Sequence, residues 1–251
     1  MGIQTALDSV RDAASIVEAL RGADVLAFEA SREGGARTVR ILNAALDADD
    51  GVVALASVHA LAQVFDDQAD AALSRLLSHP RGYLREHAAW VLGARLPRFD
   101  TLGRLIGLVL EGGFAGMLAQ RSLEQWSAAA PEHVAVAVEA ALLGVRQPDA
   151  RARLVETLGL VHSRIATRAI MAVAADEAEE YVVRAAAVAA LGDATSGRGH
   201  AGAAPREAEP GILNLLTRLA EGEGGLARVA ELALLDLRAP AVAEQPVAGP
   251  R

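Results

Sequence analysis

Apolar and small residues recur every fourth position in several stretches of the chain, which is the pattern of a helix buried on one side. The clearest stretch is residues 181–192, YVVRAAAVAALG, where Val183, Ala187 and Leu191 form one stripe and Gly192 follows it. Comparable stripes recur along the chain, and each ends in a leucine. The six terminal leucines are Leu61, Leu92, Leu123, Leu158, Leu191 and Leu235, at spacings of 31, 31, 35, 33 and 44 residues.

A second amphipathic run precedes each stripe, and short segments rich in Gly, Pro or Asp separate the two runs. A period in the thirties indicates stacked supersecondary units, so the sequence predicts a helix–turn–helix unit repeated six times. The longer last spacing contains an insertion. The first helices of the six repeats are predicted at residues 38–46, 71–77, 102–110, 134–143, 165–174 and 212–219.

The segments outside the repeats differ in composition from them. Ile3–Leu20 and Val25–Ala30 are predicted as capping helices, with charged residues for the exposed face of a terminal unit. The insertion, TSGRGHAGAAPREAEP, and the C-terminal segment are rich in Gly, Ala and Pro, which favours flexible chain. The predicted organisation is capping helices at 1–35, repeats one to five at 36–194, a flexible insertion at 195–210, repeat six at 211–237, and a disordered tail or linker at 238–251.

Two stretches carry a resemblance to a known family. LREHAAWVLGA at 84–94 and VRAAAVAALGD at 183–193 resemble the second helix of HEAT-like repeats, particularly the short bacterial PBS-lyase HEAT-like repeats. The resemblance covers most of residues 36–237 and implies an all-α fold, a right-handed α-solenoid with the second helices along its concave face. It also implies that four arginines pair with a turn carboxylate or carbonyl of a neighbouring repeat. These arginines are Arg85, Arg151, Arg184 and Arg228.

The known functions of HEAT-like repeat proteins indicate which functions to expect of this chain. The family consists mostly of scaffolding and protein-binding proteins, so we expect a scaffold or adaptor that binds a protein through the concave face. Three alternatives stay open. In the first, the chain is an accessory module of a larger enzyme, and residues 1–237 bind a substrate protein or regulate a domain beyond the tail. In the second, it is a chromophore-lyase-like enzyme of the kind that serves light-harvesting proteins. In the third, it binds nucleic acid, like the branch of the family that removes alkylated bases from DNA.

The amino-acid composition and net charge of the chain narrow this list of possible functions. The net charge is −8 and all 24 basic residues are arginine, dispersed along the chain, which argues against binding to a polyanion. An Ala- and Arg-rich chain without lysine is typical of a GC-rich bacterial genome. There are no cysteines, no basic and apolar leader and no uninterrupted apolar span, so we expect a cytoplasmic protein without a membrane segment.

Motifs for catalysis or cofactors are weak. Residues 197–202, GRGHAG, match G-x-G-x-x-G, but a helix precedes them and Ala203-Ala204-Pro205 follows, so a loop is the better interpretation. The six histidines lack metal-binding spacing, and the acidic clusters fall at predicted helix starts, where acids cap helices. We therefore expect no catalytic residue, cofactor or metal. The acidic clusters are Asp47-Asp49-Asp50, Asp66-Asp67-Asp70 and Asp176-Glu177-Glu179-Glu180.

The candidate binding residues lie on the side of each second helix that faces away from the stripe. Because structural positions in this chain are mostly Ala, Leu and Val, a Trp and an Arg there are unusual, and both are enriched at binding hot spots. Trp90 is alternatively a filler between repeats. For the nucleic-acid alternative, the aromatic platforms that could stack on bases are Trp90, Trp126 and Tyr83. The candidate residues for binding a protein partner are His59, Glu86, Trp90, Met117, Arg121 and Glu156.

Overall fold

The computed structural model describes residues 1–196 and 210–238, and in these residues every regular element is an α-helix. The chain forms two compact units, Met1–Ala129 and Ala130–Arg251. The N-terminal unit contains α1 (Ile3–Arg11), α2 (Ile16–Glu33), α3 (Gly35–Leu46), α4 (Gly51–Leu61), α5 (Asp67–Leu76), α6 (Gly82–Gly93), α7 (Phe99–Glu111) and α8 (Gly113–Ser127). The C-terminal unit contains α9 (Pro131–Gly144), α10 (Pro148–Gly159), α11 (Arg164–Ala175), α12 (Tyr181–Ser196), α13 (Pro210–Ala220) and α14 (Gly225–Arg238).

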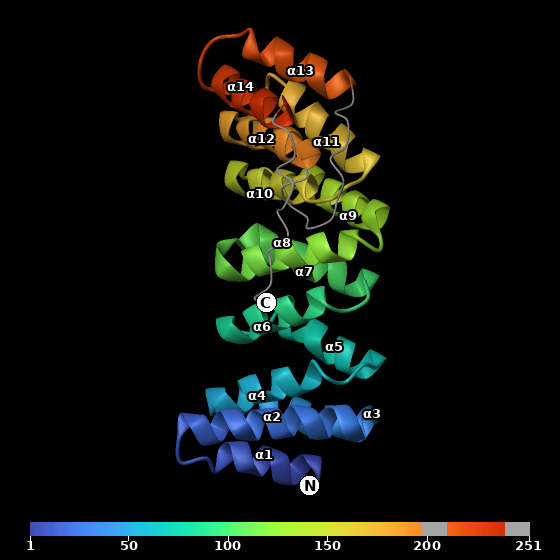
Figure 1. Cartoon of the computed structure of the whole chain (residues 1–251), viewed down its shortest axis with the longest axis vertical. Helices are drawn as coiled ribbons and strands as arrows, with labels where there is room; N and C mark the ends of the chain where they lie inside the picture. Colours follow the sequence, from blue (N-terminus) through green and yellow to red (C-terminus); the bar gives the residue numbers. More distant parts are fainter. Residues whose placement is uncertain (197–209, 239–251) are drawn as a thin grey trace, which may run out of the picture. The chain divides into compact units, whose positions relative to one another are not determined.

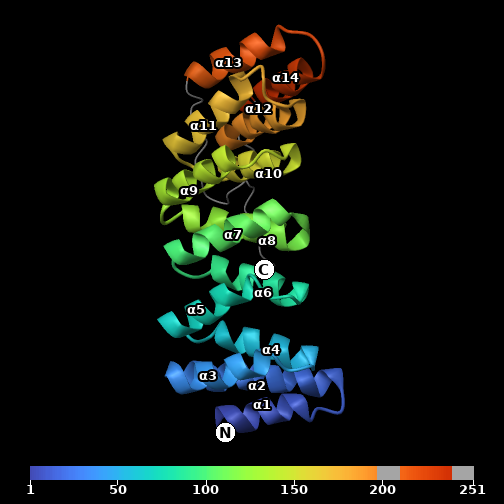
Figure 2. The same ribbon diagram turned by 180° about the vertical axis from the view of Figure 1, so that it is seen from behind.

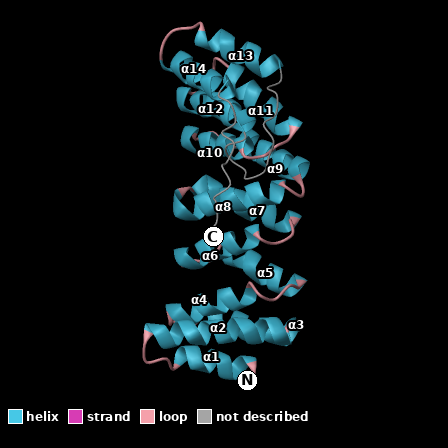
Figure 3. Cartoon of the chain, viewed as in Figure 1, coloured by secondary structure: helices cyan, strands magenta, loops and turns pink. Residues whose placement is uncertain are grey.

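Consecutive helices pair as hairpins, and the hairpins stack in both units (Figure 3). In the N-terminal unit the second helices α2, α4, α6 and α8 pack on one another in that order, and α3, α5 and α7 lie on the other side (Figure 1, Figure 2). Helix α1 packs mainly on α2 and α4. In the C-terminal unit α10, α12 and α14 form the corresponding row of second helices. The predicted all-α solenoid of helix–turn–helix repeats, with a helical pair at its N-terminus, is therefore confirmed.

Short polar side chains begin several of these helices. The Asp50 carboxylate accepts hydrogen bonds from the backbone N–H groups at the start of α4, and Asp66 accepts one from Ala69 N at 2.7 Å at the start of α5. These bonds satisfy amide groups that have no partner inside the helix. The prediction that the acidic clusters cap helices is confirmed for these two residues.

The terminal leucines of the first five stripes are the centre of the repeat cores. Leu61, Leu92, Leu123 and Leu158 are completely buried and Leu191 is 1% exposed. Removing such side chains from water is the main stabilising contribution to a fold of this kind. The predicted stripe positions of the first five repeats therefore agree with the observed cores.

The predicted stripe of the sixth repeat, Ala227, Glu231 and Leu235, is wrong at its last two positions. Leu235 is 62% exposed, whereas Ala230 is completely buried and Leu234 is 9% exposed. The predicted stripe would have placed the Glu231 carboxylate in the core without a partner, which is costly. In the structure the second anchor is Ala230, one residue earlier, and Glu231 is exposed. The buried positions of α14 are Ala227, Ala230, Ala233 and Leu234, so the predicted first anchor is buried and the other two anchors lie one residue earlier than predicted.

Glycines at the ends of two stripes are contact points between neighbouring second helices. A Cβ added to Gly159 would lie 2.9 Å from the Cβ of Ala190, and one added to Gly192 would lie 2.9 Å from that of Ala233. Real side chains do not approach so closely, so glycine is required where α10 meets α12 and where α12 meets α14.

The N-terminal helices break at a different place from the one predicted. The chain leaves helix between α1 and α2, where Ser15 Oγ accepts a hydrogen bond from Glu18 N at 3.2 Å and Glu18 accepts one from Ala14 N at 2.8 Å. This pair of bonds is a strong helix-start signal. An uninterrupted helix over Ile3–Leu20 is therefore wrong, and α2 instead runs through the predicted break after Leu20.

Most of the predicted insertion and tail lie outside the described residues, which leave out 197–209 and 239–251. The glycine-rich match at residues 197–202 is also outside them. Residues 195 and 196 are the last two of α12, and Pro210 begins α13.

The four arginines that were expected to join repeats behave in three ways. Arg85 donates to the His79 carbonyl at 2.9 Å, and Arg184 donates to the Ala174 carbonyl, so both bind carbonyls of their own repeat. Arg151 binds two carbonyls of its own repeat and also donates from Nε to both carboxylate oxygens of Glu179, in the next repeat. Only Arg151 makes the predicted contact between repeats.

Arg228, the last of the four, is exposed on α14. Its side chain makes no hydrogen bond or ion pair with another described residue. The expectation that Arg228 pairs with a turn is therefore wrong.

Candidate functional site

Three second helices of the N-terminal unit carry the same stripe of side chains on the side opposite their buried anchors. The stripe has the spacing i, i+3, i+7, which places its members on one face of a helix. We call the nine residues the second-helix patch. It consists of Val52, Leu55 and His59 on α4, Tyr83, Glu86 and Trp90 on α6, and Phe114, Met117 and Arg121 on α8.

Large apolar side chains in this patch are open to solvent. Exposed fractions are 57% for Trp90, 57% for Phe114 and 53% for Met117, and 38–50% for the other three apolar members. Single exposed apolar residues are ordinary, but a contiguous group on adjacent helices marks an interaction site. The patch is therefore the main candidate site in the N-terminal unit.

Trp90 lies at one end of a row of three rings, with His87 in the middle and His59 at the other end. Its ring centroid is 5.5 Å from that of His87, which is in turn 6.4 Å from the ring of His59 on the neighbouring helix α4. Because more than half of Trp90 is exposed, it does not fill a gap between repeats. The indole is instead held from below by His87 and presented to solvent, as an anchor for a partner would be.

His87 has an unusual environment beneath this indole. Its Nε2 atom is buried and has no hydrogen-bond partner among residues 1–196 and 210–238. Burial lowers the pKa of His87, and the nearby His59 lowers it further. The imidazole is therefore neutral at pH 7, and the patch gains no positive charge from it.

The charged members of the patch are few. Arg121 is exposed and lies 3.5 Å from the carboxylate of Glu124, one turn along α8 and buried, so it is partly paired within its own helix. Glu86 is half-buried between the two aromatic members of α6. The face is therefore mainly apolar and carries one charge of each sign.

The structure brings together five of the six predicted binding residues: His59, Glu86, Trp90, Met117 and Arg121. Glu156, the sixth, is an exposed residue of α10 in the C-terminal unit. Of the other four members, sequence reasoning named Tyr83 only as an aromatic platform and missed Val52, Leu55 and Phe114. The missing signal was the position just before each stripe, which is large and apolar in repeats one to three: Val52, Tyr83 and Phe114, with Leu55 one turn later.

Equivalent stripes of the C-terminal unit are smaller and more polar. The stripe of α10 contains two acids, Asp149 and Glu156, and that of α12 contains only one large residue, Val182. The stripe of α14 has Leu232, which is 57% exposed, as its one large apolar member. The contrast supports the expectation that a partner contacts repeats one to three.

The two other predicted aromatic platforms have structural roles. Trp126 is 1% exposed, and its Nε1 donates to the Leu92 carbonyl at 2.7 Å, so it closes the end of α6 and is not a stacking platform. The hydroxyl of Tyr83 lies close to Gly51, at the start of α4. Tyr83 therefore joins α6 to α4 while leaving part of its ring exposed in the patch.

Within residues 1–196 and 210–238, no group of three or more His, Asp or Glu side chains is placed to hold a metal ion. The same ranges contain no helix that is both long and apolar enough to cross a bilayer.

Comparisons with known proteins relate this chain to solved solenoid structures. The chain resembles the Kap95p structure that describes binding to RanGDP, with a TM-score of 0.62, 12% identity and 94% of this chain against 35% of that one. It resembles importin beta in an ammonium sulfate condition with a TM-score of 0.60, 10% identity and the same two coverages. The chain thus spans about a third of the length of both proteins.

Human deoxyhypusine hydroxylase matches with 17% identity, 94% of this chain and 96% of that one, but its TM-score of 0.40 is too low to support an argument. No protein-family model matches the chain, and no curated protein matches it. At these identities the likeness concerns the fold alone. The chain therefore has a HEAT- or armadillo-like α-solenoid fold.

Proposed function

We propose that the chain is a protein-binding scaffold or adaptor and that its partner docks on the second-helix patch of the N-terminal unit. The observation that carries the proposal is the exposure of six large apolar side chains on three adjacent second helices. Bringing such surface out of water contributes roughly 25 cal/mol per Å². A partner that covers the patch would gain that stabilisation, with Trp90 at the centre.

The composition of the patch supports a protein partner more than the other classes. Trp, Tyr, Phe, Met and Arg are the residue types enriched in protein interfaces, and the patch contains one of each. The neighbouring helix α2 exposes Val17, Leu20 and Phe28, which widens the apolar surface of the same row. The Kap95p structure, which describes binding to RanGDP, is an example of this fold acting on a protein.

The proposal also includes the repeat family of the chain and the kind of partner that it binds. The motifs at 84–94 and 183–193 support membership of the PBS-lyase HEAT-like repeat family. The partner is either a separate protein or a downstream domain of a longer chain. Nucleic acid is disfavoured, because Arg121 is the single arginine of the patch and already lies beside Glu124.

The test is a binding comparison between two single substitutions. Proteins retained by the immobilised wild-type chain from a lysate of its source organism would be purified and titrated against each variant by calorimetry. Trp90→Ala should weaken binding by about tenfold or more, since truncating a central aromatic anchor costs about 2 kcal/mol or more.

The control is Leu232→Ala, at the equivalent stripe position of α14. It removes an equally exposed apolar side chain, so it should leave the affinity unchanged. Circular dichroism would show that both variants keep the melting temperature of the wild type. Equal affinities of the Trp90→Ala variant and the wild type for every purified partner would refute the proposed site.

A further inference from the structure

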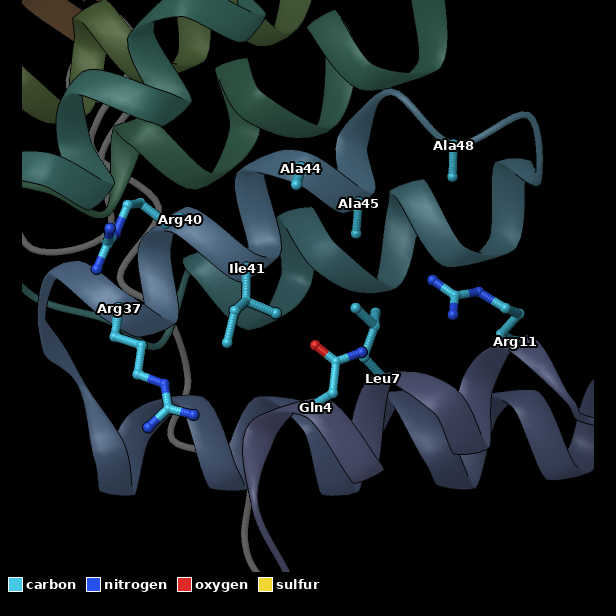
Figure 4. Close-up of a pocket in the computed structure, with 9 residues that line it drawn as sticks. All are labelled: Gln4, Leu7, Arg11, Arg37, Arg40, Ile41, Ala44, Ala45 and Ala48. Carbon is cyan, nitrogen blue, oxygen red and sulfur yellow. The ribbon is translucent and has the colours of Figure 1, made fainter.

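A groove runs between α1 and α3, the first helices of the first two hairpins, and shares no residue with the second-helix patch (Figure 4). Its volume is about 470 Å³. The floor is apolar, with buried Leu7 and Ala45 and partly exposed Ile41. The remaining lining residues are Gln4, Arg11, Arg37, Arg40, Ala44 and Ala48.

The charged side chains of the groove are all positive. Three of its nine lining residues are arginines and none is a carboxylate, in a chain with a net charge of −8. Figure 4 shows Arg37 and Arg40 toward one end of the groove and Arg11 toward the other, with Ile41 and Leu7 between them. Positive charge therefore flanks an apolar middle section.

These arginines have little to neutralise them. Arg37 makes no hydrogen bond or ion pair within the described residues, and Arg40 contacts only the Ala36 carbonyl of its own helix, at 3.4 Å. Arg11 has an ion pair with Asp8 at 3.1 Å, and both side chains are about half exposed. At least two guanidinium groups are thus available to an anionic ligand.

We propose that this groove binds an acidic peptide segment of a partner protein, with carboxylates on both sides of a short apolar stretch. Arg37 and Arg40 would hold the carboxylates at one end, Arg11 would hold those at the other, and apolar side chains would lie on Leu7 and Ile41. The nine-residue α1 spans about 13 Å at roughly 1.5 Å per residue. About four extended residues cover that length at roughly 3.3 Å each.

The shape and lining of the groove favour a peptide over other anions. A small molecule is usually enclosed on most of its surface, whereas this groove is open along its length between two helices. A nucleic-acid backbone would place phosphates along the whole groove, including its apolar floor, and would meet a chain of net negative charge. A peptide satisfies both the charged ends and the apolar middle.

The experiment is a selection of peptides on the full chain. A displayed library of random dodecapeptides would be selected on the wild-type protein, and the enriched peptides would be synthesised with fluorescein and titrated by anisotropy. We expect enrichment of peptides with Asp or Glu on both sides of apolar residues. Their affinity should fall by about tenfold or more for Arg37→Gln/Arg40→Gln, because two charge-assisted contacts are lost.

A matched control keeps the same change of net charge. Arg21→Gln/Arg168→Gln replaces two exposed arginines outside the groove and should leave the affinity within about twofold of wild type, because distant exposed charges are screened. Trp90→Ala should also leave it unchanged, so this inference and the proposed function fail independently.

Three outcomes would overturn the inference. One is a set of selected peptides without an excess of acidic residues. Another is equal affinity of the acidic peptides for the groove variant and the wild type. The third is binding of a labelled DNA duplex that disappears in Arg37→Gln/Arg40→Gln while no acidic peptide binds, which would assign the groove to nucleic acid.

Discussion

Arg95→Met should destabilise the N-terminal unit more than replacement of any other arginine whose contacts are described above. Only 4% of the Arg95 side chain is exposed, although it is charged. It donates to the carbonyls of Leu61, Ala62 and Val64, at 2.8–2.9 Å, and to the Asp70 carboxylate at 3.1 Å. One guanidinium thus closes the end of α4 and fixes the start of α5.

The expected magnitude follows from these contacts. Methionine keeps most of the aliphatic volume of Arg95, so the loss is mainly electrostatic. Removing one partner of a buried ion pair costs about 3–5 kcal/mol, because the other charge is left without compensation. Arg95 also lies 4.3 Å from the centre of the Phe65 ring, a cation–π contact of about 0.5–1 kcal/mol. We expect a loss of about 3–5 kcal/mol in the free energy of unfolding.

The assay is urea denaturation followed by tryptophan fluorescence. Both tryptophans, Trp90 and Trp126, lie in the N-terminal unit, so the signal reports on the unit that contains Arg95. The control is Arg98→Met, whose nearest partner Asp67 is 92% exposed and whose contact with Asp70 is longer, at 3.9 Å. Exposed ion pairs contribute about 1 kcal/mol or less, so this variant should change little.

A comparison of Arg95→Met with Arg98→Met tests whether the buried contacts of Arg95 stabilise the unit. If Arg95→Met and Arg98→Met lower the free energy of unfolding equally, the buried contacts of Arg95 contribute no more than an exposed pair. A second check is Asp70→Asn in the Arg95→Met background. It should cost less there than in the wild type, because the unpaired buried charge has already been created.

Two further predictions concern a glycine contact and a histidine. Gly159→Ala should destabilise the C-terminal unit by about 1–3 kcal/mol, because the new methyl group would overlap Ala190. Gly103→Ala should instead stabilise α7 by up to about 1 kcal/mol, because a methyl group at Gly103 would meet no other atom. Thermal unfolding followed by circular dichroism would compare the two variants. Because the lowered pKa of His87 weakens proton binding in the folded state, stability should fall as the pH drops below about 6.5, by at most about 1.4 kcal/mol per pH unit. His87→Gln should remove that part of the slope in urea titrations, and identical slopes would contradict the assignment.

The fold was predictable from the sequence because its main signal is local and repeated. A stripe at every fourth position fixes the buried side of a helix, and its recurrence fixes the stacking of the pairs. The one error of register, at Leu235, occurred where a glutamate stood at the middle anchor position. The presence of Glu231 at that position is itself evidence against the predicted register, because burying an unpaired carboxylate is costly.

The site was predictable only in part. Trp90, Met117 and Arg121 were found because an exposed position was compared between repeats. Arg95 and Trp126 were beyond sequence reasoning, because their partners are backbone carbonyls about 30 positions away that have no sequence signature. Contacts of this kind depend on the packing of one repeat on the next.

The glycine contacts between second helices have a consequence for how such a chain can change in length. The fifth repeat contains both halves of the contact: Ala190, which receives the glycine of the preceding repeat, and Gly192, which meets the following one. A duplicate of this repeat placed directly after it would therefore find a matching surface on each side. Whole repeats can be gained or lost in evolution by duplication or deletion, because the new junction between repeats would use the same glycine–alanine contact as the existing one.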